Sequence, residues 1–218
     1  MAKKTKVTEN SIITAYMDYV LEHNEHPKSV YLFAKTNGFD EAEFYAFFAS
    51  FEAIEQHIFL AFFNNSLAVL NKSDDYLSFD PRNKLLSFYY TFFENLTANR
   101  SYVVYALNAH KNKLKSLKQL SKLKNEFQNY IESLDIDMLD VKEQRLEKIQ
   151  EKSLKESAWL QLMFTLKFWI DDTSPSFEKT DLFIEKSINT TFDVLNIAPV
   201  KSVIDFGKFL FKEKFKMN

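Results

Sequence analysis

The sequence contains no cysteine, and only two glycines and four prolines among its 218 residues. Without cysteine the chain has no disulfides, thiolate nucleophiles, iron–sulfur clusters or cysteine-based zinc sites. So few glycines and prolines cannot supply the turns of a β-sandwich or a barrel. Neither a glycine-rich phosphate loop nor a nucleophile elbow is present. The sequence therefore predicts an all-α protein that is not an enzyme and holds no cofactor.

Membrane and metal signals are weak as well. The apolar stretch Trp159–Ile170 is interrupted by Gln161 and Lys167 and is too short to span a bilayer. The first ten residues are polar and lysine-bearing, unlike a signal peptide, so we expect a cytoplasmic protein. His23 and His26 have helical spacing but no evident third ligand, and His57 and His110 stand alone, so we predict no metal site.

Aromatic residues are abundant, at 16% of the chain with 23 phenylalanines, so a large apolar interior must be packed or lined. Each of the four prolines stands where a helix could begin, and apolar residues recur at steps of three and four between them. We expect helices at 9–23, 28–35, 40–46, 50–70, 81–97, 100–115, 117–134, 140–171, 175–196 and 199–215. The polar stretch 71–79 reads as a linker, which predicts a headpiece over 1–55, continuing in a connecting helix to about 70, and a body over 71–218.

The segment from Ser29 to Ile54 predicts two short helices joined by a turn. Gly38 can adopt the left-handed backbone that such a turn requires. Asp40 and Glu43 have the spacing of a capping box for the second helix, and Ser50 is a cap for a long helix after it.

This segment resembles the helix-turn-helix of the TetR family of transcriptional regulators. The family pattern has a Thr/Ser cap, an Ile-Ala pair, a Gly-Val turn, Tyr-x-x-Phe on the recognition helix, and Lys-Glu-x-Leu at the opening of the next helix. Without a gap, these positions correspond here to Ser29, Phe33-Ala34, Gly38-Phe39, Tyr45-x-x-Phe48 and Phe51-Glu52-Ala53-Ile54. The resemblance implies a DNA-binding surface that includes Lys28, Ser29, Tyr45 and Ser50, and a three-helix core with Ala34, Phe39, Phe44 and Phe48. Packing or capping is the alternative role for each of these residues.

The sequence departs from that family where DNA would be held. Phe51 stands where the family has a lysine, and the expected recognition helix carries Asp40, Glu41 and Glu43. From Glu22 through Gln56 there are seven acids against two lysines, a local charge of −5. This is the wrong sign for a surface that neutralises phosphates. Lys3, Lys4 and Lys6 form either a basic arm for the minor groove or a solvated tail.

The body is expected to bind itself and a ligand. The resemblance implies a homodimer formed by the last long helices, where Phe177, Ile184, Ile188 and Leu195 are spaced along one face. The abundance of phenylalanine and tyrosine suits a pocket for a long or flat apolar molecule, with core filling as the alternative. Candidate lining residues are Phe88, Phe92, Tyr102, Tyr105, Trp159 and Met163.

Two stretches are rich in lysine. The first runs from Lys111 to Lys124 without an acid and predicts a solvated face. The second, residues 199–215, predicts an amphipathic helix that docks on its own body or lies on an anionic membrane surface.

Three functions remain open, one of which is a purely structural dimerising module. The first is a TetR-like regulator that releases DNA when an apolar ligand enters the body. The alternative is a TetR-fold protein that has lost DNA binding, binds a lipid or isoprenoid, and assists another protein at a membrane surface.

Overall fold

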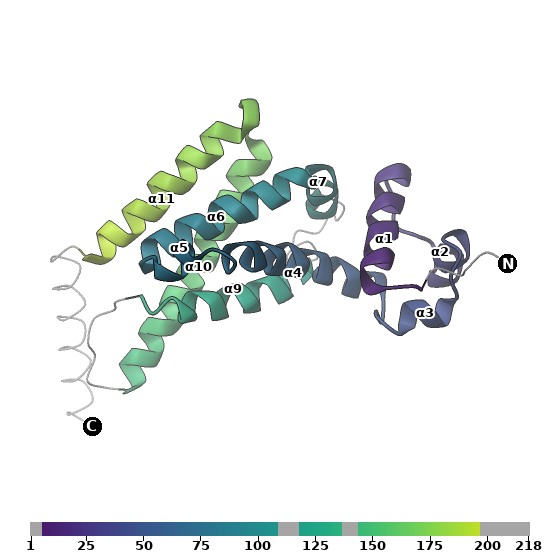
Figure 1. Cartoon of the computed structure of the whole chain (residues 1–218), viewed down its shortest axis with the longest axis horizontal. Helices are drawn as coiled ribbons and strands as arrows, with labels where there is room; N and C mark the ends of the chain where they lie inside the picture. The colour runs from purple at the N-terminus through teal and green to yellow at the C-terminus, as the bar shows by residue number, and fades with distance from the viewer. Residues whose placement is uncertain (1–5, 109–117, 137–143, 197–218) are drawn as a thin grey trace, which may run out of the picture. The chain divides into compact units, whose positions relative to one another are not determined.

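The computed structural model describes residues 6–108, 118–136 and 144–196, and within these ranges the chain is helical with no strand. The helices are α1 (Glu9–His23), α2 (Val30–Thr36), α3 (Glu41–Tyr45), α4 (Phe51–Leu70), α5 (Asp74–Ser78), α6 (Pro81–Ala98), α7 (Arg100–Asn108), α9 (Ser121–Ser133), α10 (Gln144–Asp171) and α11 (Glu178–Asn196), with a 3₁₀ turn, η1 (Pro175–Phe177), before the last (Figure 1). The all-α prediction is confirmed. None of the helices in the described ranges is long and apolar enough to cross a membrane.

The chain divides into two compact units. Unit 1 contains residues 1–67 and 92–126, and unit 2 contains residues 68–91 and 127–218. Unit 1 therefore combines α1, α2, α3 and most of α4 with α7. Unit 2 contains α5, the first part of α6, α10 and α11.

Unit 1 contains the helix-turn-helix. Helices α2 and α3 pack on one another, and α1 packs on α7. The buried face of α1 is built by Ile12, Tyr16 and Val20, which recur every four residues. Such spacing places side chains on one side of a helix, so α1 contributes one apolar stripe to the interior of the unit.

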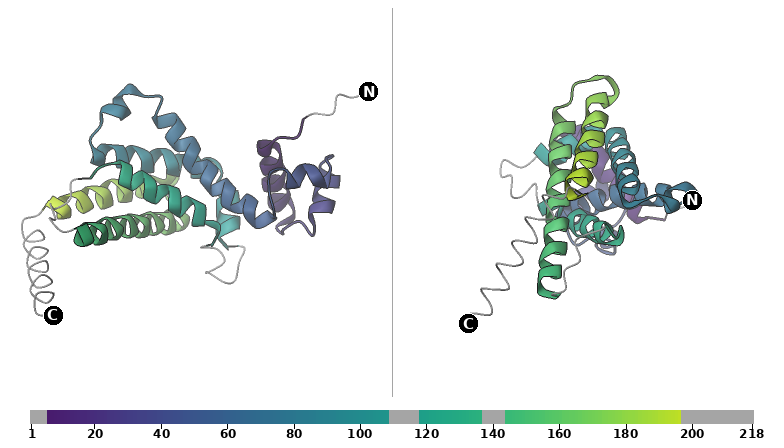
Figure 2. Two further views of the ribbon diagram at one scale, coloured as in Figure 1. Left: turned by 90° about the horizontal axis from the view of Figure 1, so that it is seen from below. Right: turned by 90° about the vertical axis from the view of Figure 1, so that its left-hand side faces the viewer.

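Unit 2 is built around long antiparallel helices. Helices α10 and α11 run side by side (Figure 2). Trp169 of α10 and Ile184 and Ile188 of α11 are fully buried. Phe88 of α6 contacts Phe127 and Tyr130, with ring centroids 5.7 and 4.9 Å apart. These aromatic contacts form much of the interior of the unit.

Several helix ends differ from the sequence expectation. Pro81 begins α6, as predicted, and the Asp80 carboxylate caps this helix by accepting a hydrogen bond from the Asn83 amide at 2.7 Å. Pro27 instead precedes Ser29, which caps α2, so that helix begins later than expected. The expected linker 71–79 contains α5, capped by Ser73. Serine caps and the acids that follow them favour such a short helix.

The turn between α10 and α11 is more elaborate than the single helix start expected at Pro175. Ser176 and Phe177 have positive φ angles, so the α-helix begins only at Glu178. Asp172 organises this turn through its hydrogen bonds. Its carboxylate accepts hydrogen bonds from the amide and hydroxyl of Thr180 at 2.9 and 2.7 Å, and from those of Ser174 at 2.8 and 2.7 Å.

Candidate functional site: the headpiece and the aromatic body

The local geometry of the helix-turn-helix follows from its capping residues. The Ser29 hydroxyl accepts a hydrogen bond from the Leu32 amide at 3.2 Å. The Glu43 carboxylate accepts one from the Asp40 amide at 2.8 Å, so the predicted capping box is present. Gly38 has a φ of 73°, the left-handed conformation expected of the turn.

An aromatic cluster holds the headpiece together. Ala34, Phe39, Phe44 and Phe48 are buried, as predicted for the three-helix core. Phe51 also belongs to this cluster, because its ring stacks on Tyr16 at 5.5 Å and meets Phe44 edge-on at 5.4 Å. The side chain that replaces the expected lysine therefore has a packing role. Three aromatic residues in the stretch 47–51 were the only sequence signal for it.

The four residues expected to meet DNA lie at the surface or near it. Lys28 and Ser29 are exposed, and Tyr45 is 52% exposed at the end of α3. Ser50 is half-buried, and its hydroxyl accepts a hydrogen bond from the Ala53 amide at 3.3 Å. The capping roles of Ser29 and Ser50 are thus established, whereas contact with DNA stays a prediction.

The surface of α3 is acidic, and α2 exposes apolar side chains. Asp40, Glu41 and Glu43 lie at the start of α3, which has no lysine or arginine, whereas α2 carries Lys35 and no acid. Tyr31 and Leu32 of α2 are exposed, and so is Phe47 after α3. Lys6 is exposed, and Lys3 and Lys4 of the predicted basic arm lie outside the described residues. This surface offers phosphates few cations.

A buried polar network in unit 1 was missed by the sequence reasoning. The Tyr16 hydroxyl of α1 donates to a carboxylate oxygen of Glu55 of α4 at 2.7 Å. Nδ1 of His26 lies 3.2 Å from that oxygen and 3.0 Å from the Tyr16 hydroxyl. Burial, together with the Glu55 charge, raises the pKa of Tyr16, which keeps its proton as a donor. An acid at position 55, on the apolar face that includes Ile58 and Phe62, was the available signal.

The histidines have partners other than a metal. Nε2 of His57 lies 3.1 Å from a carboxylate oxygen of Glu9, and Nδ1 of His23 lies 2.9 Å from the Tyr19 carbonyl oxygen. The part of the chain that the structure describes contains no group of three or more residues able to hold a metal ion.

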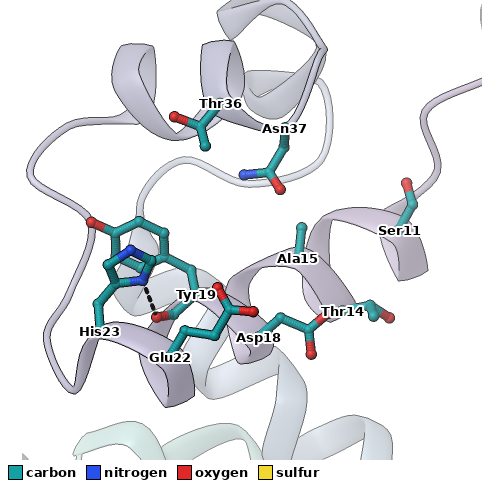
Figure 3. A pocket seen from close by; sticks show the side chains of 9 residues that line it. All are labelled: Ser11, Thr14, Ala15, Asp18, Tyr19, Glu22, His23, Thr36 and Asn37. Carbon is teal, nitrogen blue, oxygen red and sulfur yellow. Dashed lines mark hydrogen bonds between the residues drawn. The ribbon is translucent and has the colours of Figure 1, made fainter.

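An open groove of about 490 Å³ lies between α1 and the end of α2 (Figure 3). Asp18, Glu22 and His23 of α1 line one side, and Thr36 and Asn37 line the other. None of the six predicted ligand-pocket residues lines it. Its acidic side adds to the negative charge of the headpiece.

The predicted ligand-pocket residues are divided between the two units. Phe92, Tyr102 and Tyr105 belong to unit 1; Phe88, Trp159 and Met163 belong to unit 2. Within unit 2, Phe88 and Trp159 both contact Phe127, at 5.7 and 6.4 Å between ring centroids. Tyr105 and Met163 are half-buried and the other four are buried. The role of these six in binding a ligand stays a prediction.

The residues predicted for the dimer interface differ in exposure. Ile184 and Ile188 have no exposed surface in the single chain, because their stripe of α11 faces the interior of unit 2, and their role in a dimer stays a prediction. Phe177 is half-buried against Trp169, and the side chain of Leu195 lies outside the described residues. The exposed large apolar residues on these two helices are Ile149, Leu160, Phe164 and Phe168 of α10 and Leu182 and Val194 of α11.

The predicted lysine-rich features are described only in part. Lys118, Lys122 and Lys124 fall in described ranges, and Leu120 and Leu123 between them are buried. Residues 109–117 and the predicted amphipathic helix at 199–215 lie outside the described residues.

Comparison with known proteins identifies the family. Residues 84–210 match the family described as "Tetracyclin repressor-like, C-terminal domain". No curated protein matches the chain. A solved structure of the fatty acid degradation regulator FadR from Bacillus halodurans is similar at 19% identity, over 84% of this chain and 96% of that chain, with a TM-score of 0.46. Because the family match covers more than half of the sequence, the chain belongs to the tetracycline repressor-like family of transcription regulators, which are not enzymes.

Proposed function

We propose that this protein is a homodimeric transcription regulator that binds DNA through α2 and α3 and an apolar small molecule in its helical body. The observation that carries the proposal is the intact helix-turn-helix joined to a body of the tetracycline repressor-like family. Ser29 caps α2, Gly38 makes the turn, and Tyr45 is exposed at the end of α3. Such a pair of helices is the standard unit for docking in the major groove.

The exposed apolar side of α10 supports the dimer. Leu160, Phe164 and Phe168 recur every four residues, so they share one face, and they are 55%, 67% and 37% exposed. Phe183 of α11 stacks on Phe168 with 4.6 Å between the ring centroids, which extends this face onto the next helix. Contiguous apolar surface of this kind marks an interface, and a twofold dimer is the commonest way to cover it.

The charge of the headpiece supports a second candidate. Affinity for DNA depends largely on lysines and arginines that neutralise phosphates, and α3 carries Glu41 and Glu43 instead. A protein of this fold that has given up DNA and binds a lipid or isoprenoid as an accessory to another protein would not need those cations. The segment that would contact a membrane, 199–215, lies outside the described residues.

The test of DNA binding is selection of genomic fragments by the purified protein at low and at physiological salt. We expect enrichment of a palindromic site that survives physiological salt, and loss of that enrichment in Tyr45→Ala. The control is Tyr90→Ala, another exposed tyrosine but one that lies on α6 in unit 2. Binding that salt abolishes in the wild-type protein would refute the DNA-binding proposal and favour the accessory role.

The dimer is tested by sedimentation of the Phe164→Asp variant. A charge in the centre of an apolar interface has no partner there, so we expect monomers at concentrations where the wild type is dimeric. Leu77→Asp is the matched control, because Leu77 is 56% exposed but lies on α5. A Phe164→Asp variant that stays dimeric would show that the α10 face is not the interface.

A further inference from the structure

Two polar side chains are sealed in the interior of unit 1 without hydrogen-bond partners. Tyr102 of α7 is 1% exposed, and Gln119, which precedes α9, is 3% exposed. Within residues 6–108, 118–136 and 144–196, no partner exists for the Tyr102 hydroxyl or for either polar atom of the Gln119 amide. Both belong to the same compact unit.

Such burial is costly. A buried donor or acceptor without a partner costs about 1–3 kcal/mol, and native proteins contain few of them. Two other buried polar groups of unit 1 have partners: the Ser66 hydroxyl donates to the Phe62 carbonyl at 2.8 Å, and the Tyr16 hydroxyl donates to Glu55 at 2.7 Å. The Tyr102 hydroxyl and the Gln119 amide together leave three polar atoms that a hydrogen-bonding molecule could satisfy.

Both side chains are tied to the same turn of α4. The Gln56 amide donates to the carbonyl oxygen of Lys118, the residue before Gln119, at 3.3 Å. Tyr105, which follows Tyr102 by one turn of α7, has its ring centroid 6.0 Å from that of His26, and His26 Nδ1 lies 3.2 Å from a Glu55 carboxylate oxygen. In keeping with this, burial and then the charge of Glu55 raise the pKa of Tyr102. The segments that carry Tyr102 and Gln119 thus both lie near the turn Glu55–Gln56 of α4.

The chemistry of the site limits the head group that it accepts. A tyrosine hydroxyl and a glutamine amide both donate and accept hydrogen bonds, so they match a group that does both. An anionic head would be repelled by the Glu55 carboxylate in an interior of low dielectric. A cationic head would compete for Glu55 with the Tyr16 hydroxyl, which already donates to it at 2.7 Å. An uncharged alcohol or carboxamide meets neither obstacle.

We propose that Tyr102 and Gln119 hold the uncharged hydrogen-bonding head group, an alcohol or a carboxamide, of an otherwise apolar ligand. The proposal rests on the ligand binding proposed above and names the class of molecule. The rest of the ligand would lie among buried apolar side chains of unit 1.

The experiment measures binding of decanol, decanamide, decanoate and decylammonium to the full chain by calorimetry. The variants are Tyr102→Phe and Gln119→Met, which keep shape but delete the unsatisfied atoms. Tyr76→Phe and Gln128→Met are matched controls in unit 2, where Tyr76 meets the Tyr130 hydroxyl at 3.0 Å and Gln128 donates to Glu156 at 3.1 Å.

We expect the alcohol and the amide to bind more tightly than the two charged probes. Each test variant should lose about tenfold in affinity for them, the equivalent of one hydrogen bond. Without ligand, the same variants should unfold at an equal or higher temperature than the wild type, because they bury fewer unsatisfied atoms. The control variants should do the reverse, losing stability while keeping affinity.

Two results would overturn the inference. If the test variants are destabilised and bind all probes like the wild type, ordered water fills the site and the two side chains are structural. If no probe binds, or the carboxylate binds best, the assigned head group is wrong. These readouts use neither DNA nor dimerisation, so they are independent of the outcome of the fragment selection.

Discussion

Removal of the Tyr16 hydroxyl should destabilise the protein measurably. The hydroxyl lies 2.7 Å from a Glu55 carboxylate oxygen, and the two side chains are 0% and 3% exposed. A hydrogen bond to a charged group contributes about 1.5–3 kcal/mol. Because His26 Nδ1 remains 3.2 Å from the same oxygen, we expect Tyr16→Phe to cost about 2 kcal/mol, in the lower half of that range.

The assay is unfolding in urea. Thermal unfolding is a second measure, in which a loss of about 2 kcal/mol corresponds to a Tm lower by roughly 4 to 8 °C for a chain of this size. Tyr31→Phe is the control, since Tyr31 is 55% exposed and its hydroxyl is free to meet water. In a Glu55→Gln background the acceptor is neutral, so Tyr16→Phe should cost only about 1 kcal/mol. A cost below about 0.5 kcal/mol, or the same cost in both backgrounds, would refute the role assigned to the buried carboxylate.

Three further predictions concern the turn, the cap and the aromatic cluster. Gly38→Ala should lower the free energy of unfolding in urea by about 1 kcal/mol, and Gly38→Asn by less, because a residue with a side chain is strained at the φ of 73°. Unchanged stability of Gly38→Ala would contradict this prediction. Burial raises the pKa of the Asp172 carboxyl, but hydrogen bonds from Ser174 and Thr180 outweigh this effect and lower the pKa from 3.8 to about 2. A carboxyl group whose pKa is lowered by folding stabilises the fold at pH values above its pKa in the unfolded chain, so Asp172→Asn should lower the Tm at neutral pH. The difference in Tm between the variant and the wild type should shrink as the pH falls from about 4 through 2. A difference in Tm that stays constant with pH would exclude the charge of Asp172 as its cause. Phe51→Lys restores the residue expected of the family. This change should lower the free energy of unfolding by about 2 kcal/mol, because it removes the Phe51 ring from the aromatic cluster of the headpiece. A variant as stable as the wild type would show that Phe51 does not stabilise this cluster.

Local signals made much of the fold predictable. Helix α1 occupies the range expected for it, and α4 and α6 begin within one residue of their expected starts. Capping residues and a proline mark these helix starts, and the apolar residues of the helices are regularly spaced. The turn before α11 was not predictable in the same way. Positive φ angles at Ser176 and Phe177 are rare for residues with side chains, and the surrounding hydrogen bonds of Asp172 select them.

The candidate sites were harder to predict because periodicity identifies an apolar stripe but not what covers it. The spacing of Ile184 and Ile188 was read as an interface, yet that stripe is buried by the same chain. The exposed face of α10 has equally regular spacing, and only the packing of α10 on α11 distinguishes the two. Glu55 and Gln119 were missed because their importance comes from burial, which sequence composition does not report.

The cap at Asp172 has a consequence for the speed of assembly. Its four hydrogen bonds fix the angle at which α11 leaves α10, and the stacked rings of Phe168 and Phe183 lock the two helices together a few residues away. A partner that docks on this face meets side chains already in place, so little conformational entropy is lost when the complex forms. Association should then be limited by diffusion and orientation rather than by rearrangement, and differences in affinity among variants of this face should appear mainly in the rate of dissociation.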